Sequence, residues 1–279
     1  MPSFIPTSDP LTPGEWQTLD RMVKAVGNST VARRIIETTG PLGAGLQTVP
    51  SDTLVGITEG YKSILGLNGT PIRPKDRKSA IVPIIFKDFI SHWRDIEESR
   101  LTGQGFPRAK AAAAASCCAR AEDKLVLFGH DLLGYEGLMT AKGRNSFYGL
   151  DWERPGQAFQ NFTKMMKLLE EKGYGGPYAA VTHPKIYSNM HRVLPGSPLL
   201  EIVPVRELLT AGVFKSEALK PETGLVIATG KQNFELIIGV DTSAAFLGAR
   251  NMNLPFRVLK SIYLRIRRED AICTFAPKP

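Results

Sequence analysis

The sequence has little cysteine and no long apolar run. Only 3 of its 279 residues are cysteines, with Cys117 and Cys118 adjacent and Cys273 alone, and this pattern excludes a disulfide framework. No apolar stretch approaches the roughly 18 residues needed to cross a bilayer, so no membrane-spanning helix is predicted. The first ten residues carry neither a basic nor an apolar segment, so we expect no signal peptide. These absences together predict a soluble protein of the cytoplasm.

Residues suited to metal binding and catalysis are also sparse. The four histidines show no ligand spacing, and the three cysteines form no C-x-x-C pair, so no metal site is predicted. A G-x-S-x-G nucleophile elbow is missing as well. We therefore predict no catalytic residue and no enzyme activity.

Two glycine-rich stretches fail the tests for nucleotide-binding loops. Residues 224–231 have five residues between the glycines instead of four, and Gln232 stands where Ser or Thr must hold magnesium. The Leu-Val-Ile interior of this stretch is typical of a buried strand. Residues 40–45 reverse the dinucleotide spacing and follow a predicted helix, where a strand is required. Neither stretch predicts a bound nucleotide, and we expect no cofactor there.

The net charge of +8 is the clearest bias in the composition. Such a charge attracts nucleic acid or anionic surfaces when it is concentrated on one face. The basic clusters here are short, at residues 73–78 and 265–268, and they are not interleaved with stacking aromatics. We therefore predict neither nucleic-acid nor membrane binding.

The strongest helix signal lies at residues 107–128. Pro107 suits a first helical position and Gly129 suits a left-handed cap. Between them stand five consecutive alanines at 111–115, which lose no side-chain entropy in a helix and leave a slim rod that another backbone can approach closely. We predict a spine helix packed flat against a sheet, in which the Glu122–Asp123 pair forms structural ion pairs.

The N-terminal part predicts a helix followed by an extended arm. Thr12 and Glu15 have the spacing of a capping box, and apolar residues then recur at helical spacing through residues 10–39, with a kink or break at Gly27. Residues 46–88 hold short β-like runs and too little apolar surface for a core of their own. We expect a two-stranded arm that rests on another subunit, with residues 82–87 as its returning strand and a short helix at 89–100.

The remaining chain predicts an α+β fold with no repeated βαβ unit. Helices are expected at 157–172, 184–193 and 205–211. Strands are expected at 177–182, 224–229, 234–240, 256–267 and 271–275, with a hairpin at 230–233 joining two of them.

These residues together resemble the family 1 encapsulins, nanocompartment shell proteins with the HK97-type phage capsid fold. The likeness runs nearly end to end and rests on the order and spacing of several short matches. Those matches are Pro10-Leu-Thr with Trp16, Gly40-Pro-Leu-Gly43, Trp93-Arg-Asp-Ile-Glu, the spine with Glu122-Asp123, Gly134-Tyr-Glu-Gly-Leu138, Gly176-Pro-Tyr178, residues 234–247 and residues 256–274.

The resemblance implies a division of the chain into capsid parts. Residues 1–45 would be an inner-wall helix and loop, and 46–88 the extended arm (E-loop). Residues 89–136 and 229–279 would form the peripheral domain, and 137–228 the axial domain. The homo-oligomeric icosahedral shell would enclose a cargo protein that bears a C-terminal targeting peptide, commonly a ferritin-like iron-storage protein or a peroxidase.

The resemblance also implies site residues. The cargo peptide would bind between the N-terminal helix and β-like residues 241–246, with Arg33, Ile36 and Glu37 on one side and Asp241, Ala244 and Phe246 on the other. A loop would ring a five-fold pore that admits iron, formed by Ala211, Gly212, Val213, Phe214 and Lys215. Trp93 is a candidate for stacking a flavin, because some relatives bind one.

Two alternatives to a cargo shell stay open on sequence alone. A phage major capsid protein would share the fold and package DNA. A flavin-binding enzyme would use Trp93. The sequence does not give the cargo, the triangulation number or the selectivity of the pore.

Overall fold

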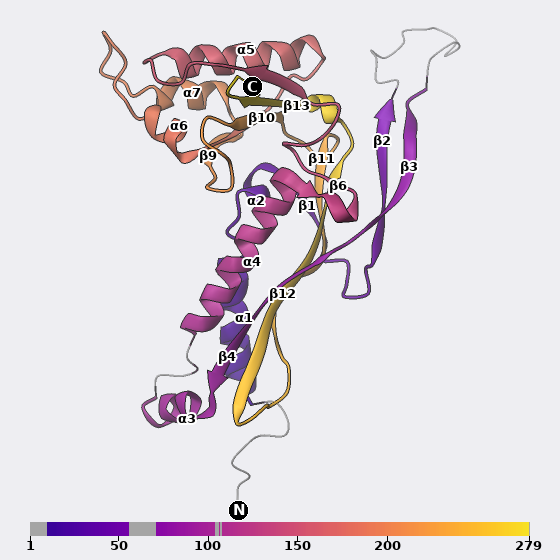
Figure 1. Cartoon of the computed structure of the whole chain (residues 1–279), viewed down its shortest axis with the longest axis vertical. Helices are drawn as coiled ribbons and strands as arrows, with labels where there is room; N and C mark the ends of the chain where they lie inside the picture. The colour runs from indigo at the N-terminus through magenta and orange to yellow at the C-terminus, as the bar shows by residue number, and fades with distance from the viewer. Residues whose placement is uncertain (1–9, 56–70, 104–105, 107, 279) are drawn as a thin grey trace, which may run out of the picture.

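The computed structural model describes residues 10–55, 71–103, 106 and 108–278. Figure 1 shows an elongated molecule with a small sheet at one end, a long sheet and a spine helix running away from it, and a two-stranded arm beside the long sheet. The small sheet has the strand order β7-β13-β10-β8-β9, and the long sheet has the order β1-β11-β12-β4.

The first part of the chain contains the N-terminal helices, the arm and the spine. Its elements are α1 (Pro13–Gly27), α2 (Ala32–Ile35), β1 (Thr38–Thr39), β2 (Thr48–Val55), β3 (Arg73–Ile81), β4 (Ile84–His92), α3 (Trp93–Leu101), α4 (Ala109–Phe128), β5 (Gly129–His130), the 3-10 turn η1 (Asp131–Leu133), β6 (Tyr135–Glu136) and β7 (Asn145–Tyr148).

The second part completes both sheets. Its elements are α5 (Gln157–Glu171), β8 (Tyr178–Thr182), α6 (Pro184–Asn189), α7 (Ile202–Leu208), β9 (Gly212–Lys215), β10 (Gly224–Ala228), β11 (Phe234–Phe246), β12 (Asn253–Ile266), the 3-10 turn η2 (Glu269–Ala271) and β13 (Ile272–Ala276).

The spine helix α4 packs against the long sheet, as the alanine-rich sequence predicts. Its buried face carries small residues, among them Ala111, Ala115 and Cys118, and this face packs with Phe256 and Val258 of β12. Small side chains let the helix lie close to the strands. Gly129 ends the helix with φ 73° and ψ −158°, so its φ is positive as glycine allows, but the left-handed αL cap predicted there is wrong. Pro107 lies outside the described residues.

The N-terminal helix begins at the predicted capping box. Thr12 Oγ1 accepts a hydrogen bond from Glu15 N at 3.3 Å, and Thr12 N donates to Glu15 Oε2 at 2.8 Å. The helix stops at Gly27, where the sequence predicts a break. A Cβ at Gly27 would come within 2.4 Å of Thr242 on β11, so this close approach requires glycine. Residues 38–39, predicted as helix, are instead the edge strand β1.

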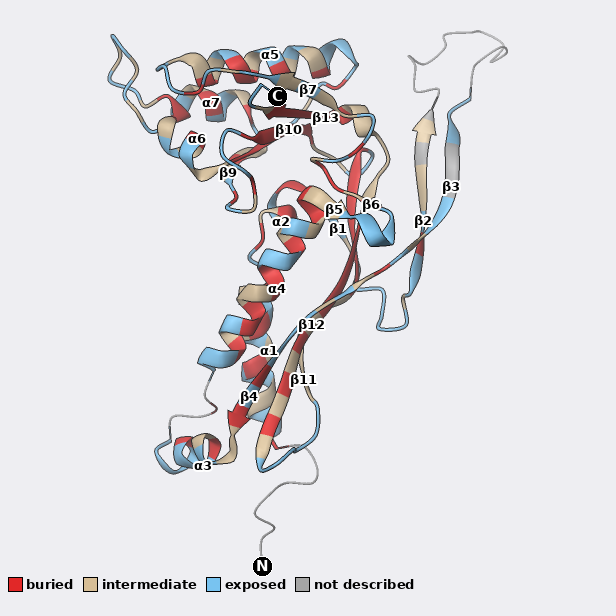
Figure 2. Ribbon diagram, viewed as in Figure 1, coloured by how far each residue is buried: buried red, intermediate tan, exposed pale blue. Residues whose placement is uncertain are grey.

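The arm is formed by β2 and β3, which pair in antiparallel register from Thr48↔Ile81 to Val55↔Arg73. The base of the arm is held by the long sheet, because Tyr263 donates to Ser51 Oγ at 2.8 Å. Farther out the arm projects from the molecule with few buried residues (Figure 2). The predicted centre of the arm at residues 56–70 lies outside the described residues.

The returning strand predicted at 82–87 belongs to the long sheet and not to the arm. It is part of β4, which pairs with β12 from Ser261↔Ile84 to Asn253↔His92. The helix predicted at 89–100 therefore begins later, at Trp93, because Phe89 and Ser91 are buried as strand residues. The last residues of β4 were predicted as helix because strong helix-forming residues follow them in α3.

The small sheet is the centre of the largest core. Strands β8 and β10 are buried at every position, and α5 covers them with Phe162, Met165 and Leu169. Figure 2 shows the buried residues concentrated in these strands and in the inward faces of β11 and β12.

The hairpin predicted at 230–233 is wrong. Strand β10 lies in the small sheet and β11 in the long sheet, so the turn carries the chain from one sheet to the other.

The predicted bounds of two helices also differ from the structure: α6 stops at Asn189, and α7 runs from Ile202 to Leu208. Strand β13 pairs with β10, so the chain returns to the small sheet after β12. The α+β class is confirmed, and the domain boundaries at 45, 88, 136 and 228 stay predictions.

Candidate functional site

The predicted cargo-docking residues come from two segments that the fold places side by side. Strand β1 pairs in parallel with β11 through Thr38↔Leu236, and Leu236 N donates to the Glu37 carbonyl at 2.9 Å. Farther along β11, Arg33 Nη1 donates to Asp241 Oδ1 at 3.0 Å. The structure therefore joins the two sides of the predicted site through this ion pair.

Arg33 also reaches the spine helix. Its Nε donates to Glu122 Oε1 at 2.9 Å, and Thr30 Oγ1 donates to the same oxygen at 2.9 Å. The other Glu122 oxygen is paired with Lys260 of β12, whose Nζ also donates to the Gly27 carbonyl at 2.6 Å. Glu122 and Lys260 have no exposed side-chain surface. A buried ionic network thus ties the N-terminal segment to the spine and the long sheet.

The structural ion pairing predicted for the spine carboxylates holds for Glu122, but its partners are distant in sequence. Asp123 instead binds backbone N–H groups. It accepts hydrogen bonds from Val31 N at 3.2 Å and from Ala32 N at 2.9 Å, which satisfies free N–H groups at the start of α2.

Burial and charge pull the pKa values of this network in opposite directions. Burial raises the pKa of Asp241, but the hydrogen bond from Lys24 and the positive charge of Arg33 lower it by more. The pKa of Asp241 therefore lies below the usual value of an aspartate. Burial lowers the pKa of Lys260, against the attraction of the Glu122 carboxylate. Burial raises the pKa of Asp123 despite its two backbone hydrogen bonds. Asp241 is therefore a charge that is already balanced within the subunit.

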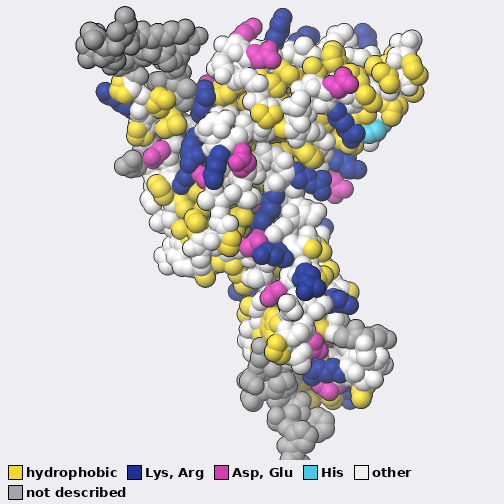
Figure 3. All heavy atoms as spheres, turned by 180° about the vertical axis from the view of Figure 1, so that it is seen from behind, with side chains coloured by type: hydrophobic (Ala, Val, Ile, Leu, Met, Phe, Trp, Pro, Cys, Tyr) yellow, Lys and Arg dark blue, Asp and Glu magenta, His cyan; other side chains and the backbone are white. Residues whose placement is uncertain are grey.

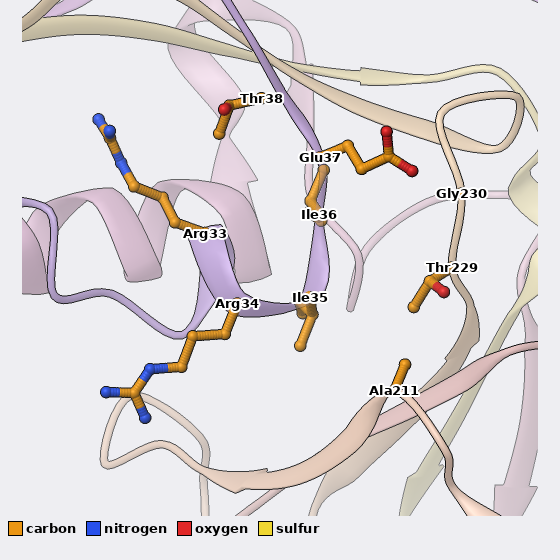
Figure 4. Close-up of a pocket in the computed structure, with 9 residues that line it drawn as sticks. All are labelled: Arg33, Arg34, Ile35, Ile36, Glu37, Thr38, Ala211, Thr229 and Gly230. Carbon is orange, nitrogen blue, oxygen red and sulfur yellow. The ribbon is translucent and has the colours of Figure 1, made fainter.

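Two cavities of about 400 Å³ each adjoin this network. The first lies between the α2–β1 segment and Ala211, Thr229 and Gly230 (Figure 4). In the close-up, the Arg33 and Arg34 side chains point away from Ala211 and Thr229, whereas Ile35 points toward them. The second lies between α1 and β11. Its lining residues are Asp20, Arg21, Lys24, Pro41, Gly43, Ala44 and Gly239 to Ser243.

The remaining predicted docking residues differ in exposure. Ile36 is 3% exposed and belongs to the core, and Glu37 is exposed. Ala244 is half-buried, and its N–H donates to Asp20 Oδ1 at 3.1 Å. Phe246 is half-buried, with its ring centroid 5.4 Å from that of Phe256. Asp20, Arg21 and Lys24 were missed by sequence analysis, although their spacing on one helix face beside β11 fits the same groove.

The residues predicted to form a pore loop are an edge strand. Gly212 to Lys215 form β9, which pairs in parallel with β8, and Val213 is 7% exposed. The loop prediction is therefore wrong for these residues, because Val213 packs into the core of the small sheet. Lys215 is exposed, with Nζ 5.9 Å from the Tyr187 ring centroid. A longer excursion lies between α6 and α7, at the far end of the small sheet (Figure 1).

Trp93 stands at the first position of α3 and is half-buried. The Arg94 guanidinium lies 5.4 Å from its ring centroid, and the His92 ring lies 5.9 Å from it. The indole is therefore already in contact with flanking side chains of its own chain.

The described residues form neither a metal-binding cluster nor a membrane-spanning helix. No group of three or more His, Cys, Asp or Glu side chains in the described part of the chain is arranged to hold a metal ion. None of the helices formed by those residues is both long and apolar enough to cross a membrane.

Comparison with known proteins places this chain among shell proteins. A family model described as "Encapsulating protein for peroxidase" matches residues 7–263. The type 1 encapsulin shell protein EncA of Myxococcus xanthus is 45% identical over 277 residues, which span 98% of this chain and 96% of that protein.

Two solved structures are similar to this fold. A virus-like particle from Pyrococcus furiosus has a TM-score of 0.73 at 15% identity, over 94% of this chain and 99% of that one. The capsid of the Myoviridae phage XM1 has a TM-score of 0.63 at 13% identity, over 87% of this chain and 90% of that one. At these identities the likeness shows the fold alone, and it confirms the HK97-type capsid fold.

Proposed function

The chain belongs to the encapsulin family, and from that premise we propose that its copies close into an icosahedral shell in the cytoplasm that holds a cargo protein. The fold carries phage capsids as well, but the family match covers most of this chain and favours the cargo shell. The subunit acts as a wall and a docking surface, with no catalytic residue of its own.

The observation that carries this proposal is an apolar cleft with exposed aliphatic and aromatic side chains on the subunit surface. A cleft of about 710 Å³ runs between β4 and α4, lined by Ile84, Phe86, Leu125 and Phe128 among others. Ile84 is 65% exposed and Phe86 is 53% exposed. Exposed apolar patches of this kind mark interaction surfaces. Contacts with neighbouring copies would bury the cleft.

The arm supports the same conclusion. Its described strands pair with each other, and β2 is held to the rest of the subunit by hydrogen bonds at Ser51 and Leu54. A two-stranded ribbon with so few further contacts is marginal in water. Viewed from behind, hydrophobic side chains lie along the arm between lysines and arginines (Figure 3). An arm that is ordered by a neighbouring copy couples subunit folding to assembly.

Sedimentation of the purified chain tests the proposal. Wild type should sediment as a large closed particle, whereas Phe86→Asp should place a charge in the cleft and yield free subunits. Lys167→Asp, at an exposed position on the outer face of α5, is the surface control and should leave particles intact. A stable, folded wild-type monomer at micromolar concentration would overturn the shell.

The cargo site is proposed as the groove that contains both cavities and the Arg33–Asp241 pair. An extended C-terminal peptide of the cargo suits a groove along a strand edge, with apolar side chains inserted between polar contacts. Because Asp241 already pairs with Lys24 and Arg33, a basic residue of the peptide would meet Glu37 or Asp20 instead. A ferritin-like iron-storage protein or a peroxidase is the proposed cargo.

Two further roles are proposed for single segments. The edge strand β9, with Ala211 before it, would face neighbouring copies around the five-fold axis and line a pore there for iron. Trp93 would stack a flavin if the side chains of His92 and Arg94 turn aside. Flavin absorbance on purified shells that is lost in Trp93→Ala would support this second role, and colourless shells after incubation with flavin would exclude it.

A further inference from the structure

A separate cavity of about 460 Å³ lies where the spine helix meets the small sheet. Helix α4 supplies one wall, and the segment that follows β9 supplies the facing wall. Its lining residues are Val31, Arg120, Asp123, Lys124, Pro184, Lys215, Ser216, Glu217 and Ala218.

The lining brings together three cationic side chains from two distant segments. Arg120 and Lys124 lie one helical turn apart on α4, and Lys215 comes from β9. Within the described part of the chain, none of the three forms an ion pair with a carboxylate. Arg120 Nη2 instead donates to Cys117 Sγ at 3.3 Å, and Lys215 Nζ faces the Tyr187 ring at 5.9 Å. The three charges are therefore not balanced by salt bridges.

Two carboxylates also line the cavity, and neither offsets these cations directly. Asp123 is directed at α2, where it accepts the Val31 and Ala32 N–H groups. Glu217 is exposed at the rim. With three cations and two carboxylates the cavity lining carries a net positive charge, and Asp123 is already hydrogen-bonded to the backbone of α2.

Further cations contact residues of the neighbouring segments. Arg34 lies 5.9 Å from the Phe214 ring, and Arg206 donates to the Tyr187 hydroxyl at 3.2 Å. Lys220 lines the adjacent apolar cleft, which shares Lys124 with this cavity. From behind, Lys and Arg side chains gather where the two parts of the molecule meet (Figure 3). Such a cluster raises the local concentration of anions.

The cavity lining also contains the hydroxyl group of Ser216. Ser216 is 6% exposed, and its Oγ accepts a hydrogen bond from Ala218 N at 3.3 Å. Because a serine hydroxyl both accepts and donates, its hydrogen is available to a ligand in the cavity.

We propose that this cavity is a binding site for a small multivalent oxyanion, a phosphate-bearing molecule with two or more negative charges. Guanidinium and ammonium groups form short, charge-assisted hydrogen bonds with phosphate oxygens, and all three cations line this one cavity. The cavity volume lies within the range of small-molecule sites. The bound anion connects α4 to the small sheet and stabilises the two parts against each other.

Pyrophosphate binding to cargo-free wild-type shells tests the site, by calorimetry at low ionic strength. We expect saturable binding near one per subunit, and no binding of acetate at the same concentration. Lys124→Glu should weaken binding by at least about tenfold, as expected for loss of a charge-assisted bond. Lys167→Glu changes the net charge by the same amount as Lys124→Glu, but Lys167 is exposed on α5 and does not line the cavity. This variant should bind like wild type. Equal weakening in both variants, or no saturable binding, overturns the proposal.

A measurement on wild-type shells covers the case in which Lys124→Glu does not assemble. Pyrophosphate should protect Lys124 and Lys215 from amine acetylation, while Lys167 reacts at an unchanged rate. Unchanged acetylation of Lys124 and Lys215 at saturating pyrophosphate would contradict the site. Lys124 belongs to neither the cargo groove nor the pore, but it also lines the apolar cleft proposed as a subunit contact. Sedimentation of each variant therefore reports the shell separately, and absence of anion binding by intact wild-type particles overturns the anion site alone.

Discussion

The guanidinium of Arg33 lies 3.0 Å from Asp241 Oδ1, although 208 residues separate the two in the chain. The same group holds Glu122 of the spine through Nε at 2.9 Å. One side chain therefore fixes the N-terminal segment against both β11 and α4, and these contacts form one boundary of the proposed cargo groove.

Removal of this side chain should destabilise the subunit. Arg33→Ala leaves the buried Glu122 and the half-buried Asp241 each short of a partner, and we expect a loss of about 3 kcal/mol. Arg33→Lys should recover only part of it, because one ammonium lacks the planar fork that reaches both carboxylates. Thermal unfolding of shells at fixed concentration measures the effect. The neighbouring Arg34→Ala, at an exposed position, should cost under about 1 kcal/mol, and equal losses at both positions would contradict the clamp.

The buried Glu122–Lys260 pair should show strong non-additivity. Glu122→Leu strands the Lys260 ammonium in the core and should cost about 3–5 kcal/mol. The double variant Glu122→Leu/Lys260→Met replaces the pair by apolar groups of similar size, so it should be more stable than Glu122→Leu alone. A double-mutant cycle by chemical denaturation gives the coupling. Additive losses would show that the two side chains do not interact in solution.

The lowered pKa of Asp241 predicts acid sensitivity. In the window between its folded pKa and 3.8, the native state binds fewer protons than the unfolded state. The stabilisation is therefore fully present above that window and is lost as pH falls through the folded pKa. Asp241→Asn removes this titration, so its stability should change less than that of wild type between about pH 5 and pH 3. Parallel pH profiles for the two proteins would rule out this contribution.

A substitution at Phe246 distinguishes a role in cargo docking from a role in core packing. The Phe246 ring is half-buried, and its centroid lies 5.4 Å from that of Phe256, so the ring contributes to the packing of the subunit. If the peptide also uses it as an anchor, Phe246→Ala should weaken cargo binding by about 1–3 kcal/mol in shells that still assemble. Co-purification of tagged cargo with sized shells measures loading. Intact shells with full loading would eliminate Phe246 from the cargo site.

Lys215 should impede iron if β9 lines the five-fold pore. A ring of exposed ammonium groups repels ferrous ions, so Lys215→Glu should admit iron faster than wild type, most clearly at low salt where screening is weak. Stopped-flow oxidation of iron by loaded cargo measures entry. Lys167→Glu makes the same change of charge at an exposed position of α5 and not on β9, and it should leave the rate unchanged. Identical rates for wild type and Lys215→Glu would remove β9 from the pore.

Local signals in the sequence predicted those elements whose structure depends on near neighbours. The capping box at Thr12 and the alanine run at 111–115 are complete within one helix, so the starts and faces of α1 and α4 could be predicted. The family likeness supplied Arg33 and Asp241 as one site. Neither hydrophobic periodicity nor spacing could have joined them, because their contact depends on the pairing of β1 with β11.

The errors arose where tertiary pairing overrides local preference. Residues 230–233 look like a hairpin, yet β10 and β11 find partners in different sheets. Val213 is drawn into the core by parallel pairing with β8, so β9 is a strand where a loop was expected. Lys260 offered a missed signal: it continues the alternation of buried positions on β12 after Leu254, Phe256 and Val258, which predicts a buried ammonium in need of a carboxylate.

The position of β13 within the small sheet sets an order of events during synthesis. In the described part of the chain, β7 has β13 as its sheet partner, and β10 also pairs with β13. A nascent chain therefore makes β7 long before the strand that completes its hydrogen bonds, and β13 follows β11 and β12. The small sheet therefore closes only after β13 has been made, and β12 of the long sheet precedes β13 by one short turn, so the two sheets are completed late and almost together.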